Sequence, residues 1–383
     1  MAANLEKKLP SVVLVAGTLS DIITKVRPPH AADDLPPWRI IASVKLRLGL
    51  IGLGNGWESH HRPALRSLAD RFEVRAVFDQ IAHRAQSTAS QFEAAPVEGF
   101  RCLTQREDID AVLLSSDGWY GPLPVLAACD SGKAVYFAGA AGISLRDSQL
   151  VRRRVRDSGI AFVGELVRRH TPATLRLKEL MATKLGPAKL IFCHFRGSEP
   201  DREHRCPEGT EPDPCRHELV ELIDWCRFAV GLEPTWVTST AHSMYPLSSS
   251  LLLRPDFQTI TLDFSRSQQP GTGPMAQISC SRYIPSCWSE ALGYRPRAAM
   301  QVACELGIAF VDLPSTLVWF DQAGRHQESL DNDRPVGERL LTRFFRAVTS
   351  LVVNTTDLDD ICRAIEIFEK ATRSHEEGRR IEL

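Results

Sequence analysis

The sequence has no excess of charge of either sign, because its 46 Lys and Arg stand against 47 Asp and Glu, for a formal net charge of -1. Without a basic field there is no general attraction for nucleic acid or an anionic membrane. No apolar run approaches the roughly 18 residues needed to cross a bilayer. The ten cysteines are scattered rather than closely spaced, and no internal repeats are evident. These absences favour a reducing, cytoplasmic setting and a small-molecule partner.

What the chain does have is an ordinary globular composition, with 43% hydrophobic and 24% charged residues over 383 positions. That length is enough for two domains of common size. Residues 1–45 are predicted to form an irregular extension, because the stretch 27–38 holds four Pro and two adjacent Asp. Lys7 and Lys8 precede a short apolar run, but Pro10 interrupts the flank and no convincing cleavage pattern follows, which argues against a secretory signal.

Strands alternating with helices are predicted from Leu46 to about residue 167. Apolar runs recur at residues 46–51, 74–78, 109–114, 134–137 and 160–163. Strands that alternate with helices at this spacing require crossover connections and give a mostly parallel sheet covered on both faces. We therefore predict an α/β fold with a doubly wound, Rossmann-type domain over residues 46–167.

The first apolar run ends in a glycine turn, GLGNG, at residues 52–56. A pyrophosphate needs exposed backbone N–H groups at a helix N-terminus and glycines that permit a close approach. Gly52 and Gly54 supply the first two positions of the G-x-G-x-x-G pattern, whereas Trp57 stands at the third. The predicted dinucleotide site therefore includes Gly52, Gly54, Asn55, Gly56 and Trp57.

Asp79 ends the second apolar run, twenty-five positions beyond Gly54. A carboxylate at this place accepts hydrogen bonds from the adenosine ribose and repels a 2′-phosphate, which favours NAD. Arg84 is near enough to reach a 2′-phosphate instead, so NADP stays open. Ser115 and Ser116, which follow the third run, are predicted to line the nucleotide cleft.

From about Thr171 strand-like segments accumulate without alternating helices. They lie at residues 190–195, 236–240, 259–264, 276–283, 308–312 and 317–320. This pattern predicts a second domain over residues 168–383, of the α+β class, with one large and mostly antiparallel sheet. Two helices over residues 338–353 and 357–377 are predicted to close the chain, with apolar stripes typical of core packing.

Several short motifs occur in order along the chain. They are the glycine turn followed by His60 and Pro63-Ala64-Leu65, Val77-Phe78-Asp79, Gly132-Lys133-Ala134-Val135 and the closing Ser374-His375-Glu376-Glu377-Gly378. In these features the sequence resembles the glucose-fructose oxidoreductase, inositol dehydrogenase and MocA family. The resemblance implies a Rossmann domain, a C-terminal sheet domain, and NAD or NADP. It further implies hydride transfer to or from a sugar, polyol or related carbonyl compound, and homo-oligomers that assemble through the sheet.

The chain departs from that family at its catalytic motifs. The family's Glu-Lys-Pro aligns with Ala138-Gly139-Ala140, so the lysine that the resemblance implies is absent, and Lys133 lies before the strand and does not replace it. Tyr120 stands where a histidine is common. The family's Asp-x-Gly-x-His-x-x-Asp motif aligns with residues 217–224. It places His217 at the first aspartate, Glu221 at the histidine and Asp224 at the last aspartate.

Physical reasoning from the residues still allows a mechanism. If residues 216–229 are helical, His217, Glu221 and Asp224 share one face. We expect burial and a neighbouring carboxylate to raise the pKa of Glu221, making it the acid/base with His217 as its partner. Alternatively, Glu221 and Asp224 simply form ion pairs with His217 or Arg227. The matching alternative function is a dinucleotide-binding protein that has lost catalysis and acts as a sensor or oligomeric partner.

Two further groups of residues contain metal-ligating or basic side chains. His204, Cys206, Cys215 and His217 are zinc ligands by type, but their spacing matches no standard site, so no metal is predicted. The short basic run Arg168-Arg169 is predicted to be a solvated face or a neighbour of the cofactor.

Overall fold

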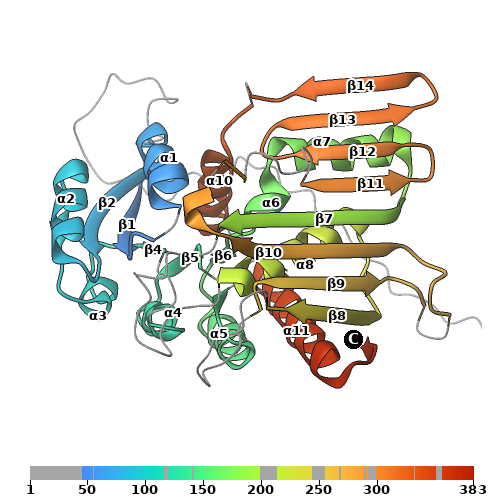
Figure 1. Ribbon diagram of the computed structural model, residues 1–383. Coiled ribbons are helices and arrows are strands. Elements are labelled where there is room, and N and C mark those ends of the chain that lie inside the picture. Colours follow the sequence, from blue (N-terminus) through green and yellow to red (C-terminus); the bar gives the residue numbers. More distant parts are fainter. Residues whose placement is uncertain are drawn as a thin grey trace, which may run out of the picture. The chain divides into compact units, whose positions relative to one another are not determined.

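Two β-sheets organise the part of the chain that the computed structural model describes (Figure 1). That part comprises residues 45–54, 56–115, 120–139, 142–198, 214–243, 255–266, 269–288, 290–291, 299–331, 333–350 and 356–383. Lys45–Leu383 form one compact unit.

The first sheet contains six strands. They are β1 (Leu46–Ile51), β2 (Phe72–Phe78), β3 (Ala95–Pro96), β4 (Ala111–Leu114), β5 (Ala134–Phe137) and β6 (Phe162–Gly164). All are parallel, in the order β3-β2-β1-β4-β5-β6, which is the doubly wound Rossmann topology. Every residue of β4 and β5 is buried, and this explains their unbroken apolar sequences. The predicted Rossmann fold is confirmed.

Helices connect these strands. They are η2 (Trp57–His61), α1 (Arg62–Ser67), α2 (Ala82–Phe92), α3 (Phe100–Thr104), α4 (Leu123–Asp130) and α5 (Leu145–Ser158). The longest of them, α5, has clear local signals at both ends. The Ser144 hydroxyl accepts a hydrogen bond from the Asp147 N–H at the start, and Gly159 adopts a left-handed φ of 67° at the end.

The second sheet has nine strands. They are β7 (Ala188–Ser198), β8 (Trp236–His242), β9 (Phe257–Asp263), β10 (Met275–Ile284), β11 (Met300–Cys304), β12 (Ile308–Asp312), β13 (Thr316–Asp321), β14 (Gly324–Ser329) and β15 (Ile381–Glu382). Their order is β14-β13-β12-β11-β7-β10-β9-β8-β15, and β7 with β10 is the parallel pair among antiparallel neighbours. The prediction of a large, mostly antiparallel sheet is confirmed.

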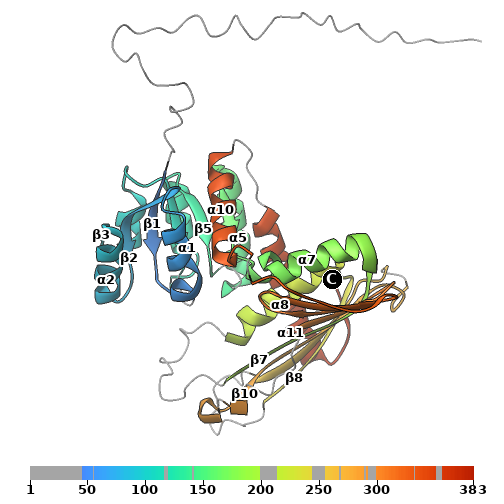
Figure 2. The same cartoon turned by 90° about the horizontal axis from the view of Figure 1, so that it is seen from above.

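Helices cover one face of this second sheet (Figure 2). α7 (Pro172–Leu180), which continues into η4 (Met181–Leu185), contacts β12 and β13; α8 (Pro214–Val230) contacts β7 and β10; α11 (Thr356–Glu377) contacts β8. Side chains alternate accordingly, because Ile191 and Cys193 of β7 are buried whereas Phe192 between them is exposed. The short elements α6 (Val167–His170) and η6 (Ser286–Trp288) complete this half. No helix within the described residues is long and apolar enough to span a membrane.

One late helix, α10 (Val336–Thr349), packs against the Rossmann sheet rather than the second sheet. Leu340, Leu341 and Phe344 share a core cluster with β1 and α1. At Gly337 the contact is so close that an added Cβ would lie 2.6 Å from the His60 carbonyl oxygen. The helix differs from the predicted 338–353 at both ends. Its N-cap is Pro335, and Ser350 turns to an extended backbone with ψ of 149°. The division at residue 167 stays a prediction.

Candidate functional site

The glycine turn joins β1 to η2 at the carboxyl edge of the Rossmann sheet. Gly52 has a φ of 76° and Gly56 a φ of 99°, a region that favours glycine. The turn is tied to its neighbours by backbone hydrogen bonds, because Gly52 N–H donates to the Phe78 carbonyl at 2.8 Å and Gly54 N–H to the Ser115 carbonyl at 2.7 Å. Ser115 therefore contributes its backbone to this edge. Asn55 and Ser116, also predicted cofactor residues, lie outside the described residues.

Asp79 lies at the end of β2, where it supports the turn. Its carboxylate accepts hydrogen bonds from the Leu53 N–H and the Ile81 N–H, both at 2.9 Å. Arg84 donates to the Leu53 carbonyl, so this guanidinium is engaged by the turn. Asp79 thus binds the N–H of Leu53, and Arg84 binds the carbonyl of the same residue.

A cleft of about 660 Å³ opens beside Asp79. Residues from the ends of β2 and β3, from α2 and from the segment after β4 line it: Phe78, Asp79, Gln80, Ala82, Ala85, Gln86, Pro96, Val97, Glu98 and Tyr120. Phe78, Phe100 and Tyr120 form an aromatic group, with 5.2 Å between the ring centroids of Phe100 and Tyr120. The size, the aromatic wall and the carboxylate suit an adenosine.

Trp57, which stands at the third glycine position, lies in the core. Its side chain is 2% exposed and its ring centroid is 6.0 Å from that of Phe92. It is not among the residues that line the cleft. The indole therefore fills the space between helix and sheet, where the chain forms the π-helical turn η2 instead of the close α-helical approach that a glycine would permit.

The predicted helix around the second family motif is confirmed as α8, and its first turns lie near the loop after β5. His217 Nε2 is 3.6 Å from Glu221 Oε1, so the predicted pairing on one helix face is correct. A Cβ built on Gly142 would lie 4.0 Å from His217 Nδ1. This loop follows the position of the missing lysine; Ala138 and Gly139 precede it, and Ala140 lies outside the described residues.

Arg168 of α6 is the main partner of the α8 carboxylates. Its guanidinium donates to both Glu221 and Glu218. Arg168 and Glu221 are both largely buried, with side chains 15% and 7% exposed. The prediction that Arg168-Arg169 is a solvated face is therefore wrong, since tertiary contacts with α8 enclose both arginines.

The expected rise in the pKa of Glu221 is also wrong. Burial opposes its ionisation, but the charges of Arg168 and His217 outweigh burial and bring the pKa of Glu221 to about 2. For His217, burial opposes the charged form, whereas Glu221 and Glu218 favour it more strongly, so the pKa of His217 is raised. His217 is also the more accessible of the pair, with a side chain 37% exposed. Glu221 is thus a fixed carboxylate and His217 the group that titrates.

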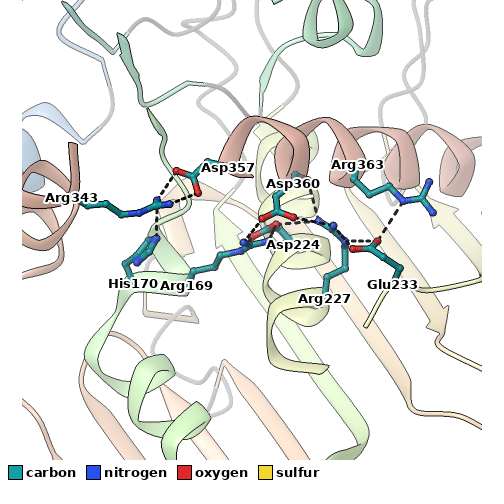
Figure 3. Close-up of polar contacts among 9 residues, drawn as sticks. All are labelled: Arg169, His170, Asp224, Arg227, Glu233, Arg343, Asp357, Asp360 and Arg363. Atoms are coloured by element: carbon teal, nitrogen blue, oxygen red, sulfur yellow. Dashed lines mark hydrogen bonds and ion pairs between the residues drawn. The ribbon is translucent and has the colours of Figure 1, made fainter. Parts of the chain in front are cut away.

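Asp224 belongs to a separate ion-pair network (Figure 3). Its carboxylate accepts from Arg169, at 2.6 Å for the Nε bond, and from Arg227 at 3.3 Å. Arg169 and Arg227 also reach Asp360 of α11. Burial raises the pKa of Asp224 to about 6 although both arginines oppose the rise. The side chain is 2% exposed, so Asp224 connects α6, α8 and α11 and does not join the His217–Glu221 pair.

A buried pair of side chains that was not predicted from the sequence, His61 and Glu165, lies close to the carboxyl edge of the Rossmann sheet. His61 Nε2 lies 2.9 Å from Glu165 Oε2, and both side chains are at least 93% buried, at 2% and 7% exposure. His61 comes from η2 and Glu165 follows β6, 104 positions later. The available signal was that Glu165 directly follows an apolar strand, at the edge where parallel sheets bind ligands. His204 and Cys206, weighed as zinc ligands, lie outside the described residues.

Comparison with known proteins gives matches in sequence and in fold. Residues 46–137 match the oxidoreductase family with an NAD-binding Rossmann fold. Inositol 2-dehydrogenase from Cereibacter sphaeroides is 31% identical over 192 residues, covering 47% of this chain and 53% of that protein. Inositol 2-dehydrogenase 3 from Saccharopolyspora erythraea is 29% identical over 184 residues, with the same coverage. The chain spans about half the length of these curated relatives.

A solved structure with the same fold is aldose-aldose oxidoreductase from Caulobacter crescentus, complexed with glycerol. It gives a TM-score of 0.73 at 14% identity over 88% of this chain and 100% of that chain. The first sheet and the glycine turn therefore match an oxidoreductase family with an NAD-binding Rossmann fold, and the two-sheet fold as a whole matches that of the solved structure. The family match lies within residues 46–137, and it agrees with the resemblance to the glucose-fructose oxidoreductase, inositol dehydrogenase and MocA family found in the sequence.

Proposed function

We propose that the protein is an NAD-dependent oxidoreductase acting on a sugar, polyol or related small polar carbonyl or alcohol compound. The observation that carries the proposal is the pairing of two features in one unit. One is the cleft with Asp79 at the end of β2, and the other is a titratable His217 held by Glu221 beside the loop after β5. Cofactor binding and proton transfer are the two requirements of a nicotinamide enzyme.

The residues present fit an adenine dinucleotide. Gly52, Gly54 and Gly56 would cradle the pyrophosphate, and Asp79 would accept hydrogen bonds from the ribose. The described residues that line the cleft include two carboxylates, Asp79 and Glu98, and no Lys or Arg. This charge favours NAD over NADP, because a 2′-phosphate would meet negative charge and no cation.

His217 is the proposed acid/base. When bound, the nicotinamide supplies hydride transfer. In alcohol oxidation His217 would accept the substrate hydroxyl proton at Nδ1, and in the reverse direction it would donate a proton to the carbonyl oxygen. Nδ1 is the ring nitrogen that faces the loop after β5, while Nε2 faces Glu221. Glu221 stabilises the protonated imidazole and orients it, and Arg168 keeps Glu221 ionised. The roles of Glu221 and His217 are therefore exchanged relative to those predicted from the sequence.

The substrate class rests on relatives. The curated proteins most similar in sequence include inositol 2-dehydrogenases, and an aldose-aldose oxidoreductase shares the fold. A polyhydroxylated substrate is consistent with the charged side chains of Glu218, Glu221 and His217 on α8, which can accept or donate hydrogen bonds to hydroxyl groups.

A cofactor-reduction screen tests this function. Purified protein is mixed with NAD⁺ or NADP⁺ and with a panel of sugars, inositols and acyclic polyols, and absorbance at the reduced-nicotinamide band is followed. We expect turnover with NAD⁺ and at least one polyol. Tight NADH binding in calorimetry without turnover in either direction would favour the alternative, a dinucleotide-binding sensor, which the missing lysine at residues 138–140 supports. Absence of NADH binding would reject both.

The uncovered face of the second sheet supports a proposal of homo-oligomers. Phe192, Met275 and Phe320 are 37%, 42% and 39% exposed, and the alternation of side chains puts them on the face opposite α7 and α8. A second copy would bury this apolar surface. Sedimentation analysis of the protein and of Phe192→Asp tests the proposal, and a monomer at micromolar concentration would reject it.

A further inference from the structure

We propose that Arg282 binds a carboxylate of the substrate, so that the preferred substrate is a polyhydroxylated acid rather than a neutral sugar or polyol. This inference rests on the proposed function, because it identifies the substrate class of the same site. Arg282 of β10 differs from the other arginines around α8 because no carboxylate of the described residues lies within hydrogen-bond distance of its guanidinium.

The other arginines around α8 each donate to a carboxylate within hydrogen-bond distance, although the Arg216 Nε, like that of Arg282, is buried without a partner among the described residues. Arg169, Arg216 and Arg227 donate to carboxylates at 2.6, 2.8 and 2.5 Å, and Arg168 donates to two. Among the described residues, by contrast, the carboxylate nearest to Arg282 is that of Glu218, whose Oε1 lies 3.8 Å from Nη2 and so beyond hydrogen-bond reach.

The Nε atom of Arg282 is buried and has no hydrogen-bond partner within the described residues. Leaving a buried donor unpaired costs about 1–3 kcal/mol. The guanidinium therefore has donor capacity that the described protein does not use.

The surroundings of Arg282 keep those donors available. Its guanidinium carbon lies 5.1 Å from the centroid of the Phe195 ring, so the cation is placed against an aromatic ring of the neighbouring strand. Stacking of this kind leaves the in-plane N–H groups free to form a fork around a planar anion. Gly197 leaves space for the guanidinium, because an added Cβ there would lie 3.2 Å from Arg282 Nη1. The side chain remains 21% exposed and therefore accessible.

Arg282 is connected to the proposed acid/base through two carboxylates. Glu218 lies between Arg282 and Arg168, and Arg168 bonds Glu221, which pairs with His217. Glu218 lies one helix turn before Glu221 in α8. A substrate whose alcohol or carbonyl carbon reaches His217 can therefore extend its far end towards Arg282.

The charges of the cluster favour a single negative charge on the substrate. Arg168 and Arg282 balance Glu218 and Glu221, so protonation of His217 leaves one uncompensated positive charge. One carboxylate neutralises it, whereas a neutral polyol does not. A phosphate ester carries more negative charge than this and would face Glu218 at close range. The chemistry of the site therefore points to a carboxylate.

The test compares ligands that differ by one carboxylate. Glucuronate is compared with glucose, and gluconate with glucitol, both in cofactor turnover and in calorimetric titration of the NADH-loaded protein; glucose 6-phosphate is the phosphate probe. We expect each acid to exceed its neutral counterpart in kcat/KM or affinity by about tenfold or more, as a charge-assisted hydrogen-bonded pair implies.

Three variants complete the test. Arg282→Met should remove the preference by raising KM for the acid while leaving kcat and the neutral ligand nearly unchanged. Arg282→Lys should keep part of the preference, because it retains the charge but not the fork. The control is Arg196→Met, an exposed residue next to Phe195 on β7, whose side chain points to the opposite face. It should behave like the wild type.

The outcomes separate this inference from the proposed function. Turnover of neutral polyols with no preference for acids, or a preference that survives in Arg282→Met, overturns the carboxylate assignment and leaves the oxidoreductase intact. Preferential, Arg282-dependent binding of the phosphate ester also overturns it. Arg282-dependent binding of an acid without turnover supports the carboxylate site and removes the proposed activity. If Arg282→Met does not fold, the carboxylate assignment is tested by Arg282→Lys and by the ratio of kcat/KM, or of affinity, for acid and neutral ligands in the wild type.

Discussion

The cleft beside Asp79 and the cluster around α8 belong to one compact unit but are built from different interactions. At the cleft, Gly52 and Gly54 form backbone hydrogen bonds, and Asp79 receives two further backbone N–H groups. At α8, by contrast, Glu218 and Glu221 are held by the guanidinium of Arg168, fifty or more positions away. The first site is mostly backbone and packing, whereas the second is mostly paired charge.

This difference explains why the glycine turn keeps most of the pattern of the family that the sequence resembles, whereas residues 217–224 do not. A backbone cradle constrains the residue type at a few positions only, chiefly where φ is positive, so it survives the change to Trp57. A charge cluster depends on every member, since removal of one partner leaves another charge buried. Replacement of the family's lysine and histidine therefore comes with a different set of partners, His217, Glu221 and Arg168.

The sharpest test of the α8 site is His217→Gln. Loss of the group that moves the proton should lower kcat by about 10²–10⁴, the usual contribution of a general acid or base. NADH affinity should not change, because the cleft beside Asp79 is untouched. Steady-state kinetics and calorimetry measure the two effects, with His83→Gln on exposed α2 as the control. A kcat close to that of the wild type would remove His217 from the mechanism.

Arg168→Met should destabilise the fold. Glu221 and Glu218 would lose their shared cation in a largely buried setting, and breaking such a pair costs about 3–5 kcal/mol. Urea denaturation measures the free energy of unfolding. Arg101→Met, at an exposed position of α3, is the matched control and should be close to neutral. Equal midpoints for the two variants would mean that the α8 carboxylates do not need Arg168.

Asp79→Ala should weaken NADH binding by roughly tenfold, because the ribose loses its acceptor and the Leu53 N–H loses its partner. NADPH should be affected less, since removing the carboxylate also removes repulsion of the 2′-phosphate. Calorimetry with both cofactors gives the ratio of affinities. An unchanged ratio, with Glu107→Ala as the surface control, would exclude Asp79 from cofactor selection.

Glu221→Gln should change activity least among these variants. Its effect should be a shift in the pH dependence of the rate. In the direction of alcohol oxidation, turnover rises as His217 loses its proton, at a pH above the ordinary histidine range because Glu221 and Glu218 outweigh burial in setting its pKa. Removing the Glu221 charge lowers that pKa, so the rising limb of the rate profile moves to lower pH. A loss of kcat as large as in His217→Gln, without such a shift, would restore Glu221 as the acid/base.

Much of the fold could be predicted from the sequence because its signals are local. Buried parallel strands such as β4 give unbroken apolar runs, and Asp79 follows directly from its strand. β14 was missed because its sequence, GRHQES, has no apolar pattern. It exists as a strand because its backbone pairs along the whole length of β13, and pairing of that kind depends on the neighbouring strand rather than on its own residues.

The chemistry around α8 could be predicted only in part. Helical spacing placed His217 and Glu221 on one face, as found. Spacing could not show that Arg168 would approach Glu221 or that Arg169 would take Asp224, since these contacts join different elements. The direction of the Glu221 pKa shift depends on the cation that spacing could not show, and so the predicted rise of that pKa was wrong.

The packing of α10 has a consequence for synthesis of the protein. Val336, Leu340 and Phe344 complete the apolar core beneath β1 and the glycine turn, although they are translated almost three hundred residues later. Until α10 has been translated, the apolar residues of β1 and α1 lack the helix that they pack against in the folded chain. A fragment truncated after residue 167 should therefore aggregate rather than bind coenzyme. In the cell, the segment around the glycine turn gains its full packing only after Val336–Thr349 has been synthesised.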